Sequence, residues 1–114
     1  MEAQERTLLT FTLPNGKAPF EEWLLSLCDK PTQACILRRI DRLRLGNLGD
    51  YRSVGEGVLE LRIHFGAGYR VYFGLYGSEV ILLLCGGDKS NQSGDITTAQ
   101  LYWKDFLTHG HEEL

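Results

Sequence analysis

The segments VLELRIHF at residues 58–65 and YRVYFGLY at residues 69–76 decide the fold. Apolar and polar side chains alternate in both segments, and successive side chains of a β-strand point to opposite faces of a sheet. Gly66-Ala67-Gly68 predicts a turn between the two strands. The apolar face is predicted to pack against helices through Leu59, Leu61, Ile63, Val71 and Phe73. The opposite face is predicted to stay open to solvent and to present Glu60, Arg62, His64, Arg70 and Tyr72.

The remainder of the chain predicts the element order β-α-α-β-β-β-α. A first strand is expected over 8–13, and helices are expected over 19–28, 31–45 and 95–107, from proline starts and apolar spacing. The continuous apolar run 80–85 predicts a strand in the sheet interior. Residues 47–57 and 86–94 are expected to be loops. The predicted fold is α+β, an antiparallel sheet with the helices packed on one face.

Length and composition predict one globular domain over residues 1–114. The chain has 114 residues, of which 43% are hydrophobic, and the polar ends 1–7 and 109–114 are expected to be flexible. Its three cysteines have no spacing typical of a zinc site or a disulfide scaffold, so neither a metal nor a cofactor is expected. No signal peptide or membrane span is visible, which predicts a cytoplasmic protein without a membrane partner.

Positive charge is concentrated in the middle of the chain, although the net charge is −3. Eight of the twelve Lys and Arg residues lie within residues 36–89. The second predicted helix carries Arg38, Arg39 and Arg42, which could bind RNA or an acidic protein segment. The alternative is an ordinary solvated helix face. The acidic total argues against a general nucleic-acid-binding protein.

Two motif blocks, ELRIHFGAGYRVYF at 60–73 and LLLCGGDKSNQSGDI at 82–96, resemble the RelE/ParE toxin superfamily. The similarity is strongest to the HigB-like group of addiction module killer proteins and extends over roughly residues 8–107. The resemblance implies a RelE-like domain and a cytoplasmic toxin of a type II toxin–antitoxin system. It implies as partners a cognate antitoxin, expected to be a helix-turn-helix protein, and the ribosome with its mRNA. Many members cleave mRNA on the ribosome, whereas the ParE branch inhibits DNA gyrase.

The resemblance also indicates which residues act. Cleavage of RNA without a metal needs a base for the 2′-hydroxyl, an acid for the leaving oxygen and cations for the phosphorane. The cations are expected to be Arg62, Arg70 and Lys89, and either His64 or Glu60 is expected to move the proton. Tyr72 and Gln92 are predicted to contact RNA together with the arginines of the second helix. The alternative is that Glu60, Arg62 and Arg70 form cross-strand ion pairs on a solvated face. Three functions stay open: an mRNA endoribonuclease, a non-catalytic gyrase inhibitor, or an inactive antitoxin-binding relative.

Overall fold

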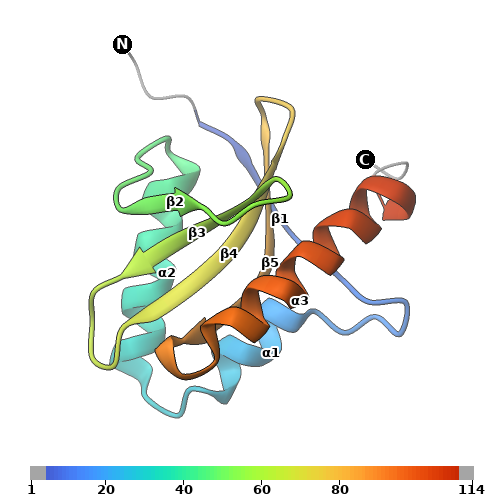
Figure 1. The fold of residues 1–114 in the computed structure, drawn as a ribbon. Helices are drawn as coiled ribbons and strands as arrows, with labels where there is room; N and C mark the ends of the chain where they lie inside the picture. The colour runs from blue at the N-terminus through green and yellow to red at the C-terminus, as the bar shows by residue number, and fades with distance from the viewer. Residues whose placement is uncertain (1–4, 111–114) are drawn as a thin grey trace.

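A five-stranded sheet forms the centre of the computed structural model, which describes residues 5–110 (Figure 1). The strands, in the spatial order β1-β5-β4-β3-β2, are β1 (Thr7–Thr10), β5 (Val80–Asp88), β4 (Tyr69–Tyr76), β3 (Val58–Ile63) and β2 (Tyr51–Ser53). The predicted α+β class is confirmed. The prediction of a wholly antiparallel sheet is wrong, because β1 pairs with β5 in parallel. The helices after β1 carry the chain to the far edge of the sheet, and a helical crossover permits parallel pairing.

Helices cover both faces of the sheet (Figure 1). Helices α1 (Pro19–Ser26) and α2 (Lys30–Arg44) lie behind the sheet, and α3 (Gln92–Asp105) crosses in front. The prediction that all helices share one face is therefore wrong for α3. The reason lies in β5, whose apolar side chains serve two cores: Ile81 and Leu83 pack on the side of α1 and α2, whereas Leu82 and Leu84 pack on the side of α3.

The prediction that the odd-numbered apolar side chains of β3 and β4 share one packed face is confirmed. Leu61, Ile63, Val71 and Phe73 are buried in the core under α1 and α2, and Leu59 packs against that core while half-buried. Antiparallel pairing places Leu61 opposite Val71 and Arg62 opposite Arg70. The even-numbered side chains of β3 and β4 consequently share the face of α3. This shared face contains the candidate site.

Local boundaries differ from the prediction: β1 ends at Thr10 and α1 at Ser26, and both predicted loops contain regular structure. Residues 47–57 include β2, and residues 86–94 contain the end of β5, a 3₁₀ turn at Lys89–Asn91 and the start of α3. The Asp88 carboxylate closes this turn by accepting hydrogen bonds from the backbone N–H and the hydroxyl of Ser90. Because the turn capped by Asp88 begins at Lys89, the helical conformation starts before Asp95, where the last helix was predicted to begin.

The two ends predicted to be flexible lie partly outside the described residues. Residues 1–4 and 111–114 are outside, whereas Thr7 begins β1 and residues 109–110 complete a helical turn after α3. Arg6 is tied to the fold at the same end, since its backbone N–H donates to the carbonyl of Arg44. Within residues 5–110, no helix is long and apolar enough to cross a membrane.

Candidate functional site, a cationic pocket beside the β3–β4 hairpin

A pocket of about 400 Å³ lies at the end of the β3–β4 hairpin, next to the turn that precedes α3. Its walls contain four of the five side chains predicted to be catalytic: Arg62, His64, Arg70 and Lys89. Three different segments supply them, since Arg62 and His64 come from β3 and the residue after it, Arg70 from β4, and Lys89 from the 3₁₀ turn. The fold therefore brings together residues that are up to 27 positions apart in the sequence, from Arg62 to Lys89.

Glu60, the fifth of these residues, lies beneath the pocket with a fully buried side chain. Its Oε1 accepts hydrogen bonds from Arg52 Nε at 2.9 Å and Arg62 Nε at 3.2 Å. Its Oε2 accepts them from the Tyr72 hydroxyl at 3.0 Å and Gln92 Nε2 at 2.9 Å. Burial by itself raises the pKa of Glu60, but these donors outweigh it and hold the pKa below its usual value.

This geometry contradicts the expectation that Glu60 lies on an open face and moves a proton. An ionised carboxylate with four donors around it has little capacity left to accept a substrate proton. It instead fixes the guanidinium groups around it, because Arg70 Nε also lies 3.6 Å from Oε2. The sequence pattern indicated a solvated face, but α3 covers this position. Of the ion pairs considered as an alternative, Arg70 pairs with Glu60 across β3 and β4, whereas Arg62 pairs with Glu60 along β3, and the carboxylate of both pairs is buried.

Arg70 is the most enclosed cation of the pocket, with its side chain only 12% exposed. Its Nε and Nη1 atoms are buried and have no hydrogen-bond partner within the described part of the chain. Buried donors are nearly always paired in folded proteins, because an unpaired one loses its hydration without compensation. Arg70 lines the pocket, so the candidate site contains a guanidinium whose hydrogen bonds are only partly satisfied.

Lys89 crosses the pocket over the glycine turn of the hairpin. A Cβ atom added at Gly68 would lie 2.9 Å from Lys89 Cε, and Gly68 has a φ of +83°, which side-chain-bearing residues rarely adopt. The Lys89 ammonium has no hydrogen bond or ion pair to any described residue. Gly68 therefore creates both the turn and the space through which the lysine reaches the pocket.

His64 sits on the rim, where its side chain is 76% exposed. Its Nε2 forms a short hydrogen bond with a carboxylate oxygen of Asp50, in the segment between α2 and β2. A carboxylate on one ring nitrogen orients the imidazole and leaves the other nitrogen available for proton exchange. Phe65, next to it in the wall, is 40% exposed and offers an aromatic face.

A second pocket, of about 200 Å³, adjoins the first on the side of α2. It contains the three helix arginines predicted to bind RNA, Arg38, Arg39 and Arg42, and shares with the first pocket the residues Arg62, Ile63 and His64. Arg39 is anchored there, since its Nη2 donates to the Leu48 carbonyl at 2.6 Å. Its pKa is lowered by burial and by the neighbouring Arg42.

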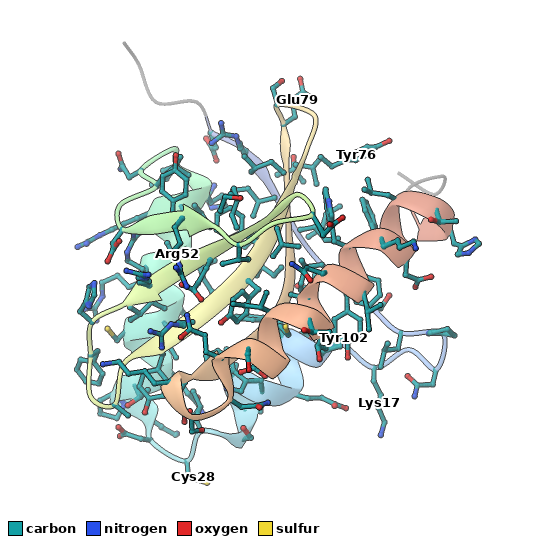
Figure 2. The ribbon with its side chains drawn as sticks, in the orientation of Figure 1. Lys17, Cys28, Arg52, Tyr76, Glu79 and Tyr102 are labelled. Carbon is teal, nitrogen blue, oxygen red and sulfur yellow. The ribbon has the colours of Figure 1, made fainter. Side chains whose placement is uncertain are left out.

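Tyr72 and Gln92, predicted to contact RNA, are occupied elsewhere. Tyr72 is fully buried, and Gln92 is half-buried with its amide on Glu60, so the prediction that Tyr72 stacks on a base is wrong in this structure. Sequence reasoning missed Arg52 and Asp50. Arg52, which lies on β2 (Figure 2), faces Glu60 in the β2–β3 register. Neither residue was identifiable, because the segment 47–57 gave no strand pattern.

Metal ligands do not gather at this site: within residues 5–110, no group of three or more His, Cys, Asp and Glu side chains is arranged to hold a metal ion. Among the described residues, six arginine and lysine side chains and a single carboxylate, that of Asp50, line the two pockets. That excess is suited to a polyanion or a charged phosphate ester.

Comparison with known proteins shows a similarity over nearly the whole chain. An "Uncharacterized protein" of Haemophilus influenzae (strain ATCC 51907 / DSM 11121 / KW20 / Rd) is 45% identical over 101 residues, which are 89% of this chain and 93% of the relative. No family model matches the chain. The likeness thus covers nearly the whole domain, including both pockets.

Proposed function

This chain belongs to the same family as that Haemophilus influenzae protein, and we propose that it is a metal-independent endoribonuclease that cleaves mRNA at the ribosome and so inhibits translation. The proposal combines the resemblance of the two motif blocks to RelE/ParE toxins with the chemistry of the pocket. As a toxin of a type II toxin–antitoxin system, it would act in the cytoplasm under the control of a cognate antitoxin.

The observation that carries the proposal is the state of Arg70. Its guanidinium is nearly enclosed, Nε lies 3.6 Å from Glu60 Oε2, and neither Nε nor Nη1 has a hydrogen bond to a described residue, while Arg62 and Lys89 line the same pocket. Donors fixed before the reaction stabilise developing charge without reorganising at the moment of reaction. A phosphodiester that passes through a phosphorane gains charge on its non-bridging oxygens, and a planar guanidinium matches two such oxygens.

In the proposed reaction, the remaining groups of the pocket move the protons. His64 takes the proton of the ribose 2′-hydroxyl, and the 2′-oxygen attacks phosphorus to form a 2′,3′-cyclic phosphate. The bond from phosphorus to the 5′-oxygen breaks, and the Lys89 ammonium gives that oxygen a proton. His64 lies on the side of α2 and Lys89 on the side of α3, so the two groups approach the phosphate from different sides.

One observation favours the non-catalytic alternative, inhibition of DNA gyrase. Glu60 is saturated by its donors, so His64 is the single predicted proton acceptor left, and it lies exposed on the rim. A protein that only binds needs no proton transfer. In that case the cationic pockets would hold an acidic surface of the target.

The antitoxin is proposed to neutralise the protein by covering the two pockets. Their excess of cations is suited to an acidic segment of a partner protein. Such a segment would mask Arg62 and Arg70 together.

The decisive experiment is primer extension on messages translated in a reconstituted system with the purified protein. Wild type is expected to cut, Arg70→Ala to cut about 10²–10³ times more slowly, and His64→Ala to lose a comparable factor. Lys104→Ala serves as the matched control, since it removes an exposed cation of α3 outside both pockets and should cut as wild type does.

Two results would contradict the proposal. If wild type cuts no message but arrests growth and inhibits gyrase in a supercoiling assay, the non-catalytic alternative holds. If Arg70→Ala cuts at the wild-type rate while its unfolding curve is unchanged, the pocket is not the catalytic site.

A further inference from the structure

The second pocket is continuous with the first rather than separate from it. Arg62, Ile63 and His64 form a common wall, with the first pocket on the side of Lys89 and the second on the side of α2. A ligand that occupies the first pocket and extends past His64 therefore enters the second. The His64–Asp50 pair stands at the boundary between them.

The cationic wall of the second pocket is one face of α2. Cys35, Arg38, Arg39 and Arg42 follow the spacing i, i+3, i+4, i+7, so they share one face of α2. Arg39 is fixed by the carbonyls of Asn47 and Leu48. The side chains of Arg38 and Arg42 are exposed and form no hydrogen bond or ion pair with any described residue, which leaves their guanidinium groups available to a ligand.

We propose that the second pocket is a subsite for the neighbouring phosphate of the RNA strand whose scissile phosphate lies against Arg70. This inference rests on the proposed function and deepens it: the substrate is an extended single strand with at least two successive phosphates. The exposed ring of Phe65 in the first pocket supports a single strand, because a base must leave its duplex to stack on an aromatic side chain. The helix arginines then bind the substrate itself rather than a distant part of the ribosome.

The test compares two RNA probes whose 2′-hydroxyls are methylated, so that neither can be cleaved. One is a dinucleotide with a single phosphodiester, and the other is a hexanucleotide. Wild type should bind the hexanucleotide more tightly, and Arg38→Ala/Arg42→Ala should lose about tenfold in affinity per lost contact for the hexanucleotide alone. The salt dependence of hexanucleotide binding should fall by roughly 0.7 in log–log slope per lost phosphate.

Cysteine chemistry gives a second readout in the same molecule. Cys35 lies in the wall of the second pocket, Cys28 is exposed between α1 and α2 (Figure 2), and Cys85 is buried with its pKa raised to about 12. The hexanucleotide should slow alkylation of Cys35 by N-ethylmaleimide and leave Cys28 unaffected. The dinucleotide should protect neither. Lys17→Ala/Lys104→Ala, which removes two exposed cations elsewhere, is the matched control.

The outcomes separate this inference from the proposed function. If the dinucleotide binds in an Arg70-dependent way but the hexanucleotide gains nothing and leaves Cys35 unprotected, the subsite is refuted and the proposed function stands. If wild type binds neither probe and cuts no translated message, the proposed function fails and the subsite fails with it. If both probes bind and the double arginine variant matches wild type, the helix arginines do not contact the substrate.

Discussion

The two faces of the sheet bury different kinds of side chain. Toward α1 and α2 the sheet packs a hydrophobic cluster that includes Leu61, Val71 and Phe73. Toward α3 the cluster is apolar at one end, around Trp103, and polar at the other, around Glu60. The alternation of β3 separates these two sets of side chains, but it does not show that the polar set is buried.

This difference indicates where the burial of polar groups carries an energetic cost. Apolar packing stabilises without pairing requirements, whereas a buried carboxylate is tolerated only when its hydrogen bonds are satisfied. The face of α3 satisfies Glu60 completely and leaves Arg70 partly unsatisfied. The unsatisfied donors lie at the pocket, so the weakly compensated part of the structure coincides with the proposed binding site.

The largest effect on stability is expected from substitution of Glu60 or Leu61, two neighbouring residues of β3 whose side chains point to opposite faces of the sheet. Glu60→Ala should reduce the free energy of unfolding by about 3–5 kcal/mol, because it leaves the buried Tyr72 hydroxyl, the nearly enclosed Arg70 and the half-buried Gln92 amide without their acceptor. Leu61→Ala should cost about 2–5 kcal/mol through the cavity it creates. Urea denaturation monitored by tryptophan fluorescence measures both values.

RNA binding then distinguishes the two faces. Glu60→Ala should weaken binding of the methylated dinucleotide, because the positions of Arg62 and Arg70 depend on this carboxylate. Leu61→Ala should leave that binding unchanged at a temperature where both variants are folded. Equal weakening in both variants would show that Glu60 supports the fold without positioning the arginines.

A smaller effect is expected from alanine at two glycines that lie under tryptophan rings. A Cβ at Gly74 would lie 2.3 Å from Trp103, on the face of α3, and one at Gly86 would lie 2.2 Å from Trp23, on the other face. Overpacking costs typically about 1–3 kcal/mol. Gly74→Ala should approach the upper value because Trp103 is buried, whereas the half-buried Trp23 can move away from Gly86→Ala. Thermal unfolding measures the difference, and an equal or reversed order would contradict this explanation.

The smallest effect on stability is expected from a change of pH, which acts through Glu60 on the face of α3. The pKa of Glu60 is lowered from 4.5 in the folded protein, so the contribution of this group to stability is fully present above pH 4.5. It is lost as the pH falls through the lower folded pKa, because the unfolded state then binds the proton first. The free energy of unfolding of wild type should therefore decrease more steeply below pH 4.5 than that of Glu60→Gln, when both are measured by urea denaturation. Parallel pH profiles would show that Glu60 does not titrate with folding.

The sequence by itself determined the α+β class, the β3–β4 hairpin and its register. These depend on local periodicity, since alternation at period two fixes which side chains share a face. The sequence also identified Arg62, His64, Arg70 and Lys89, which the fold does bring into one pocket. The helix arginines were identified as well, but their position beside that pocket was not.

Tertiary structure alone decided which face is covered and how β1 pairs. Whether α3 lies over Glu60 depends on contacts such as Trp103 above Gly74, between residues far apart in the chain. Local pattern carries no information on such contacts. The parallel pairing of β1 with β5 is another long-range contact, because it joins the first strand of the chain to the last. Burial then decided the chemistry: it changed Glu60 from an expected proton acceptor into the anchor of three arginines, because a carboxylate removed from water is stable only among donors.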